Sequence, residues 1–357
     1  MDPREGVQVS GLPQQMTYSI LRAFPPAEVE NAWRDGLSRV DYPSHYNAPG
    51  FFLDPLYRGT QRFAILALDE QAVVGVLTGA HFGDAVVCGL STRPQVCFSK
   101  SVDPTAAGEA LTQGLLEEAG RAKVLTVYSW STTPLQAFER RGFRLREFQG
   151  DVVLDLTKGP GAVFQQLDKK RRTSLRQATK TNLNVFQASS REDVLAYYEI
   201  QARWKQTSRK VIHYPTFSVD QFEQRYRLRE NIRLFLARYE GKIVAGATVR
   251  FFPGGLLEYA NNASLDEFLH LRPNDLLVWK VIEWACAEGF PRFSLGGAHL
   301  FLRKFGGTVI PIHRYRLDRT SLRWHDLKET LGDAARGRLR RLPAPVSKTI
   351  RRLMGKD

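Results

Sequence analysis

Residues 271–307 read LRPNDLLVWKVIEWACAEGFPRFSLGGAHLFLRKFGG and decide the predicted fold. Pro273 suits the first turn of a helix, and the run that follows is apolar on almost every face, which predicts a buried helix ending at Gly289. Residues 293–295 then predict a short buried strand that ends at Gly296–Gly297. A helix, a strand and a glycine turn in this order are typical of α/β folds, which often build ligand sites at such turns.

The same order of elements occurs earlier in the chain. Three pairs of landmarks lie at similar offsets: Val73–Gly75 with Val244–Gly246, Pro104 with Pro273, and residues 138–142 with 302–306. The repeat predicts two copies of one unit, with a mixed α+β sheet in each. The expected boundaries are a flexible tail at 1–17, a first unit at 18–158, a second unit at 159–320 and a basic C-terminal tail at 321–357.

Periodicity places the elements inside these units. The expected strands are 18–24, 62–68, 72–79, 85–90, 124–130, 151–156, 232–239, 242–252, 256–260, 293–295 and 310–317. The expected helices are 27–37, 104–120, 135–141, 169–180, 190–204 and 273–289, and residues 41–56 are expected to form a loop.

Composition narrows the class of protein. With 43% hydrophobic residues and six Trp in 357 residues, the chain can fill sizeable cores. No signal-peptide pattern and no apolar run of about 18 residues is found, so a cytoplasmic protein is expected. The three Cys lie in apolar surroundings and the seven His are scattered, so reduced core cysteines and no metal site are expected.

The net charge of +14 is concentrated in two segments. Residues 165–185 carry a net +5 and residues 334–357 a net +7. Such patches favour polyanionic partners: RNA, phosphorylated precursors or an anionic membrane face. The C-terminal tail is equally compatible with an interfacial helix at the inner membrane face and with a disordered basic segment.

Five motifs carry a family resemblance: AFERRGF (137–143), KKRRTSLRQATK (169–180), NDLLVWKVIEWACAEG (274–289), SLGG (294–297) and LRKFGG (302–307). In this order the chain resembles, over about residues 18–318, the FemAB-like group of the GNAT superfamily, which is built from two tandem GNAT units. The resemblance implies transfer of an acyl or aminoacyl group, from acyl-CoA or aminoacyl-tRNA, to an amine. Cell-envelope or glycan-type acceptors, phosphorylated or peptide-bearing, are the implied partners.

One departure concerns the donor. GNAT enzymes that use acyl-CoA usually place a glycine-rich loop before the long helix, whose N–H groups hold the pyrophosphate. Here that place holds residues 270–275, HLRPND, with no glycine. Asp275 would repel a phosphate, although Arg272 could compensate, so the donor stays open between acyl-CoA and aminoacyl-tRNA.

Two basic stretches are candidate binding segments. Lys169, Arg172 and Arg176, followed by Lys180, form one stripe on the predicted helix 169–180, which suits a phosphorylated ligand or tRNA but equally an ordinary solvated face. Arg203, Trp204 and Lys210 interleave cations with aromatic residues, as nucleotide and glycan sites do. The alternative for the second stretch is a helix C-terminus, which favours cations.

The remaining candidates surround the glycine turn. Asn274, Asp275, Gly296, Gly297 and Arg303 are expected to bind substrate or phosphate. Glu258, Tyr259 and Lys304 are the catalytic candidates, with Glu258 as a base of raised pKa. The alternative for Glu258 and Tyr259 is an ordinary pair on a strand, and the alternative for Arg303 and Lys304 is two surface cations on a short helix.

The resemblance implies an N-acyltransferase. Because no nucleophile–base arrangement is discernible in the sequence, we expect a bound amine to attack the activated carbonyl directly. The alternative is a non-catalytic RNA- or polyanion-binding protein that has kept the fold.

Overall fold

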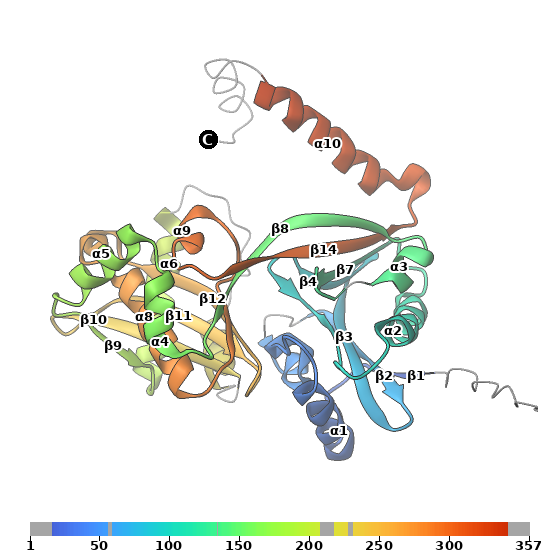
Figure 1. The fold of residues 1–357 in the computed structure, drawn as a ribbon, viewed down its shortest axis with the longest axis horizontal. Coiled ribbons are helices and arrows are strands. Elements are labelled where there is room, and N and C mark those ends of the chain that lie inside the picture. Colours follow the sequence, from blue (N-terminus) through green and yellow to red (C-terminus); the bar gives the residue numbers. More distant parts are fainter. Residues whose placement is uncertain (1–15, 56–58, 134, 208–217, 228–230, 342–357) are drawn as a thin grey trace, which may run out of the picture.

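The computed structural model describes residues 16–55, 59–133, 135–207, 218–227 and 231–341. Their strands form one fourteen-stranded mixed sheet, whose main order is β1-β2-β3-β4-β7-β14-β8-β13-β12-β11-β10-β9. The predicted mixed α/β class is therefore confirmed. Figure 1 shows two halves joined by two long strands.

The first half has helices on both faces of its sheet. Its strands are β1 Thr17–Leu21, β2 Gln61–Asp69, β3 Ala72–Phe82, β4 Ala85–Leu90, β5 Arg93–Pro94, β6 Val96–Phe98 and β7 Val124–Trp130. Its helices are α1 Ala27–Ser38, α2 Pro104–Ala119 and α3 Gln136–Arg140, with 3-10 turns at His45–Asn47 and Pro49–Phe52. Leu111 and Leu115 of α2 join one core with β2 and β3, and Trp33 and Leu37 of α1 join another on the opposite face.

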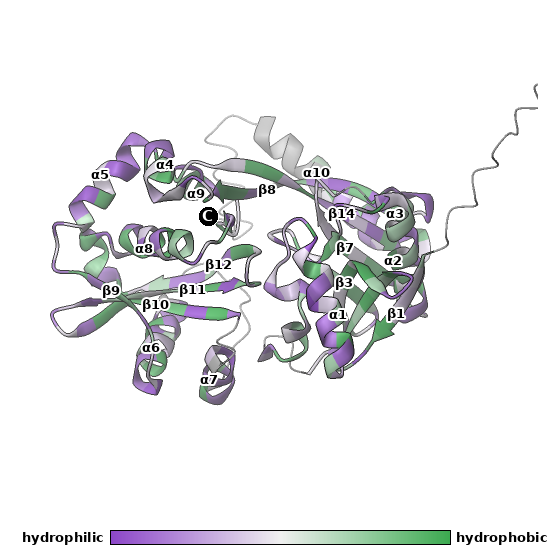
Figure 2. Cartoon of the chain, turned by 60° about the horizontal axis from the view of Figure 1, so that its bottom comes forward, coloured by the Kyte–Doolittle hydropathy of each residue, from purple (hydrophilic) through white to green (hydrophobic). Residues whose placement is uncertain are grey.

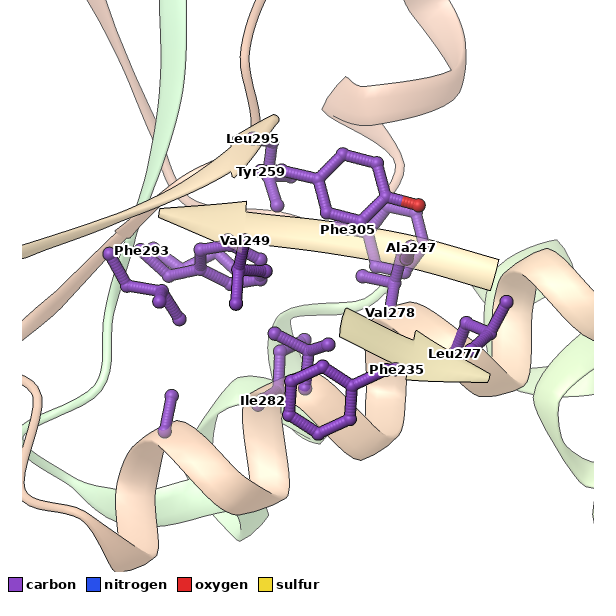
Figure 3. Close-up of a cluster of buried hydrophobic side chains, with 14 of the residues drawn as sticks. Phe235, Ala247, Val249, Tyr259, Leu277, Val278, Ile282, Phe293, Leu295 and Phe305 are labelled. Atoms are coloured by element: carbon purple, nitrogen blue, oxygen red, sulfur yellow. The ribbon is translucent and has the colours of Figure 1, made fainter. Parts of the chain in front are cut away.

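The second half repeats this arrangement. Its strands are β9 Asn184–Gln187, β10 Ile232–Tyr239, β11 Lys242–Phe251, β12 Leu256–Ser264 and β13 Arg292–Ser294. Its helices are α4 Gly159–Gln166, α5 Lys169–Ala178, α6 Arg191–Thr207, α7 Val219–Arg227, α8 Pro273–Ala287 and α9 Leu300–Arg303. Leu277, Val278 and Ile282 of α8 pack on Val249 and Phe293 of the sheet (Figure 3), whereas α6 and α7 cover the other face.

Two long strands, β8 Arg144–Asp155 and β14 Thr308–Asp318, interlock the halves (Figures 1 and 2). β14 pairs with β7 of the first half, and the end of β8 pairs with β13 of the second. β8 and β14 also pair with each other, with a register shift next to Ile310. Gly150 has a φ of +87° at this irregularity, and a Cβ there would lie 1.9 Å from the Ile310 carbonyl oxygen, so only glycine fits.

Several element boundaries differ from those expected. Helix α5 ends at Ala178, so Lys180 lies beyond the helix and does not continue the basic stripe. Residues 144–155 form one continuous strand, and α4, α7 and β9 had no sequence prediction. Within the expected C-terminal tail, α10 spans Trp324–Arg341. Residues 1–15, which are most of the expected N-terminal tail, and residues 342–357, which end the expected C-terminal tail, lie outside the described residues.

Among the helices that the structure describes, none is both long and apolar enough to cross a bilayer.

Candidate active site

The candidate site lies where two parallel strands separate. β12 and β13 pair over only three residues, from Leu256↔Arg292 to Glu258↔Ser294. Beyond Glu258, β12 continues to Ser264 along β11, whereas the chain after Ser294 turns away at Gly296–Gly297. The strands therefore diverge and leave the β13-facing edge of β12 open to a ligand.

A β-bulge sits at the point of divergence. Val249 pairs with Tyr259 but its neighbour Thr248 pairs with Asn261, so Ala260 is the extra residue. The bulge changes the alternation of faces: Tyr259 lies in the core beside α8, whereas the Asn261 side chain accepts a hydrogen bond from the Tyr197 hydroxyl of α6 at 3.1 Å. Bulges re-aim backbone and side-chain groups, and this one lies at the open edge.

The equivalent gap in the first half is filled by the chain itself. β4 and β7 are parallel and pair only up to Cys88↔Val127. β5 then folds back on β4, and the Gln95 N–H donates to the Tyr128 carbonyl oxygen at 3.3 Å. Among the described residues, therefore, it is the second half that keeps an open divergence between its central parallel strands.

A pocket of about 450 Å³ occupies this open divergence. On one side of the sheet it is lined by Tyr259, Asn274, Phe301 and Leu302, and on the other by residues of α6 and α7 with Arg250. Arg93 of the first half completes it. Elements on both faces of the sheet therefore contribute to the lining of the pocket.

Polar side chains from three adjacent strands lie in one row beneath the pocket. Arg250 of β11 is directly opposite Glu258 of β12, which is opposite Ser294 of β13. The Ser294 hydroxyl donates to a carboxylate oxygen of Asp151 on β8. Because consecutive strand residues point to opposite faces, Glu258 and Tyr259 lie on different sides of the sheet.

Burial changes the proton affinity of both acids in this row. Asp151 is fully buried, and the loss of hydration raises its pKa to about 7, against the hydrogen bonds from Ser294 and Gly297 that lower it. Burial also raises the pKa of Glu258, opposed by the charges of Arg250, Arg93 and His45. The Glu258 Oε2 has no hydrogen-bond partner among the described residues.

Three arginines line one side of the pocket. Arg250 and Arg225 are almost fully buried, and Arg93 and Arg250 both donate to the hydroxyl of Tyr46. Arg225 lies 3.7 Å from a carboxylate oxygen of Asp54, whose other oxygen is hydrogen-bonded to His45. Mutual repulsion from Arg93 and Arg225 adds to burial in lowering the pKa of Arg250, so this side of the pocket favours an anion.

Tyr259 supplies a protonated hydroxyl to the opposite side. Its hydroxyl has no hydrogen-bond partner among the described residues, although Tyr259 is only 9% exposed. Burial, and to a smaller extent the charge of Asp275, raises the pKa of this hydroxyl. The group therefore stays protonated at neutral pH and can donate a hydrogen bond to a bound molecule.

The start of α8 presents few free N–H groups to a pyrophosphate. Pro273 has no N–H, and the N–H of Asp275 donates to the Arg272 carbonyl oxygen at 3.1 Å. The Asp275 carboxylate is buried and forms an ion pair with Arg171 of α5, whose guanidinium stacks 4.1 Å from the ring centroid of Phe301. Asn274 instead donates to the Ser264 hydroxyl and lines the pocket.

The basic residues of α5 lie outside this lining. Lys169 and Arg176 are exposed, and Arg172 donates weakly to the Gln165 carbonyl oxygen at 3.4 Å. Figure 2 shows α5 as a mostly hydrophilic helix. It packs on α8 through Leu175 and Ala178, and its exposed cations lie outside the pocket lining. Their role in binding stays a prediction.

The other predicted residues are divided between the pocket and its surroundings. Trp204 and Gly296 line the pocket, whereas Arg203 pairs with Glu267 at 3.3 Å. Lys210 lies outside the described residues. Arg303 donates to the Ala298 carbonyl oxygen at 2.6 Å and so holds the turn after Gly297. The exposed Lys304 contributes its carbonyl oxygen, which accepts from the Asp168 N–H at 2.9 Å.

Comparisons with known proteins agree with this geometry. A family model described as an acetyltransferase (GNAT) domain matches residues 165–303, the part of the chain that builds most of the pocket. No curated protein matches the sequence.

Solved structures show the same fold. FemX is 14% identical with a TM-score of 0.63, and the match covers 80% of this chain and 95% of FemX. The C-terminal domain of a putative lysylphosphatidylglycerol synthetase from Agrobacterium fabrum is 16% identical with a TM-score of 0.57, covering 87% and 96%. A tandem GNAT protein from the clavulanic acid biosynthesis pathway is 14% identical with a TM-score of 0.55, covering 86% and 99%.

Residues 165–303 therefore match a GNAT acetyltransferase domain, and the chain has a tandem GNAT fold. The predicted resemblance to the FemAB-like group is confirmed.

Sequence reasoning missed Arg93, Arg225, Arg250 and Asp151. The signal for Arg250 was present, since it is a charged residue near the end of the mostly apolar strand 242–251, and Glu258 follows two apolar residues at the start of the next strand. Charges on neighbouring buried strands are usually paired or functional.

Proposed function

We propose that this protein is an N-acyltransferase that joins an amine to an acyl or aminoacyl group carried by an activated donor. The observation that carries the proposal is the pocket at the point where β12 and β13 diverge, which is lined by residues from both faces of the sheet. A site of this kind can hold donor and acceptor next to each other, which is what a direct transfer requires.

The two faces suit different substrates. The side beside α8 holds Tyr259, Asn274 and the mostly apolar Phe301 and Leu302, which fit the acyl donor. The side with Arg93, Arg225 and Arg250 fits an acceptor that carries a carboxylate or phosphate. We infer an anionic acceptor of cell-envelope or glycan type, and the likeness to FemX and to a lysylphosphatidylglycerol synthetase supports that class.

The reaction needs no nucleophile from the protein. The amine nitrogen attacks the acyl carbonyl carbon, a C–N bond forms, and the carbonyl becomes an oxyanion that N–H groups at the open edge of β12 can stabilise. When the oxyanion collapses, the bond to the donor's sulfur or oxygen breaks and Tyr259 gives its proton to that leaving atom. Glu258 is the candidate acceptor for the amine's proton, directly or through water.

The donor is acyl-CoA or aminoacyl-tRNA. The start of α8 presents few free N–H groups, whereas exposed cations of α5 lie beside the same helix. These two features favour a large polyanionic donor, so we infer aminoacyl-tRNA as the first donor to test.

The test measures binding and product together. Thermal unfolding is followed with coenzyme A, with acetyl-CoA and with charged tRNA, and each donor is then incubated with a cell-envelope extract and analysed by mass spectrometry. We expect stabilisation by one donor and an acceptor whose mass rises by the acyl or aminoacyl group. Stabilisation by coenzyme A and none by tRNA would exclude the tRNA donor. Absence of any acylated product with every donor would contradict acyl transfer and favour a polyanion-binding role.

A further inference from the structure

Helix α10 is attached to the body by its polar face. Glu329 accepts hydrogen bonds from Arg314 at 2.6 and 3.0 Å and from Arg316 at 2.9 Å, and it also pairs with Arg146. Asp326 lies 3.6 Å from Arg316. These contacts fasten one face of the helix to β8 and β14.

The apolar face of α10 consequently points to solvent. Trp324, Leu327 and Leu331, spaced three and four residues apart, are 55%, 40% and 59% exposed, and Leu322 just before the helix is 85% exposed. This is the reverse of an ordinary surface helix, which buries its apolar stripe. Figure 1 shows α10 standing away from the two halves of the sheet.

The entry to α10 is fixed rather than loose. One carboxylate oxygen of Asp318 accepts from the Thr320 N–H at 3.0 Å, and the other accepts from the Asp326 N–H at 3.0 Å. Leu322 and Arg323 both have positive φ, 58° and 49°, which is uncommon for residues other than glycine. The hydrogen bonds of Asp318 therefore hold two residues in an unfavourable backbone conformation, which fixes the direction in which α10 leaves β14.

The positive charge of the C-terminal residues indicates what binds the apolar face of α10. By sequence, residues 334–357 carry eight basic residues against Asp357, a net +7. Two copies of this chain docked through α10 would bring two such segments together and repel each other. An anionic lipid surface instead attracts the cations while Trp324 and the leucines enter the region between headgroups and acyl chains.

We propose that α10 binds the surface of an anionic membrane through Leu322, Trp324, Leu327 and Leu331. The proposal does not depend on acyl transfer, because it rests on the helix face and the charge alone.

The test uses the full chain and vesicles of phosphatidylcholine alone or in an equal mixture with phosphatidylglycerol. We expect co-flotation with the mixed vesicles, little with the neutral ones, and a loss of binding as salt rises. The double variant Leu327→Glu/Leu331→Glu should lower the partition coefficient at least about tenfold, because two apolar contacts become repelled charges. Phe82→Glu, at a 46% exposed position of β3, is the matched control and should bind normally.

Two results would overturn the proposal. One is normal flotation of the double variant with an unchanged melting temperature, which would leave the basic tail alone as the contact. The other is a wild-type chain that is dimeric by light scattering and a double variant that is monomeric, which would assign the face to a second copy.

Discussion

The carboxylate of Asp151 accepts a hydrogen bond of 2.5 Å from the backbone N–H of Gly297. Asp151 belongs to β8, which starts in the first half of the chain, and Gly297 belongs to the turn that borders the pocket in the second. The conformation of the glycine turn is therefore held from the other half of the molecule. The Ser294 hydroxyl donates to the same carboxylate and makes the anchor bidentate.

This anchor predicts a pH-dependent stability. The pKa of Asp151 is about 7 in the fold against 3.8 for the free group, so between these pH values the folded chain binds more protons than the unfolded chain. Stability that Asp151 contributes should therefore fall as pH rises through this window, by a few kcal/mol. Asp151→Asn keeps an acceptor for Gly297 and cannot ionise, so its stability should lack this decline.

The measurement is urea unfolding of both proteins between pH 4 and pH 8. Because Glu258 titrates in both, the difference between the two curves isolates Asp151. Parallel curves would show that Asp151 does not carry the titration.

Substitution of Gly296 should disturb the pocket directly. A Cβ at this position would lie 2.7 Å from the Tyr259 carbonyl oxygen, and φ is +76°. Gly296→Ala should destabilise the fold by about 1–2 kcal/mol and push the turn away from β12, with loss of acyl transfer. Gly161→Ala is the control, since nothing lies within 4 Å of a Cβ there, and activity equal to the control would disprove the role of the turn.

Removal of the Tyr259 hydroxyl should affect the chemical step. Tyr259→Phe keeps the ring in its core and deletes a proton donor that has no other partner among the described residues. We expect kcat to fall about 10²- to 10⁴-fold with little change in KM or melting temperature. Steady-state kinetics are measured with one donor that has a poor leaving group and one that has a good leaving group. The loss of kcat should be larger with the poor leaving group, and equal losses for both would contradict proton donation by Tyr259.

Arg93 should act on acceptor binding. It lines the pocket from the first half and donates to Tyr46 at 3.1 Å. Arg93→Gln should raise the KM or Kd of an anionic acceptor about 10- to 100-fold and leave donor binding unchanged. Calorimetry with both substrates tests this, and equal weakening of the two would indicate a general structural effect.

The buried pair of Arg171 and Asp275 should matter for stability. Both side chains are 8% exposed, so removing one partner leaves the other charge buried. Arg171→Met should cost about 3–5 kcal/mol, and Arg171→Met/Asp275→Leu should recover much of it. Arg203→Gln, at an exposed pair with Glu267, should change the free energy of unfolding by less than about 1 kcal/mol. Urea unfolding measures all three, and an Arg171→Met effect no larger than that of Arg203→Gln would contradict the argument.

The sequence predicted the repeated architecture because local patterns report it. The helix expected from residue 190 begins there, with the Asp193 N–H donating to the Ser190 hydroxyl at 3.1 Å, and α8 begins at Pro273 as expected. Asn274, Gly296, Trp204 and Tyr259 all line the pocket.

Other features depend on contacts between distant segments. In the sequence, Arg171 cannot be distinguished from the other cations of its helix. In the structure it pairs with Asp275, which is 104 residues away in the sequence. The arginine side of the pocket combines Arg93 with Arg225 and Arg250, which no local pattern relates. The exchange of strands between the halves, in which β14 pairs with β7 and the end of β8 pairs with β13, could not be predicted from periodicity either. The pattern of a strand does not indicate which strand it pairs with.

That exchange sets the order in which the protein can be completed during synthesis. The first half needs β14 beside β7, and Val127 pairs with Tyr315, nearly two hundred residues later. A ribosome has therefore translated almost the whole chain before the sheet of the first half can close. Cutting the chain near residue 158 would give two fragments that each lack a strand, and the exposed edges would promote aggregation. The two halves share an architecture, but each completes its sheet with a strand from the other.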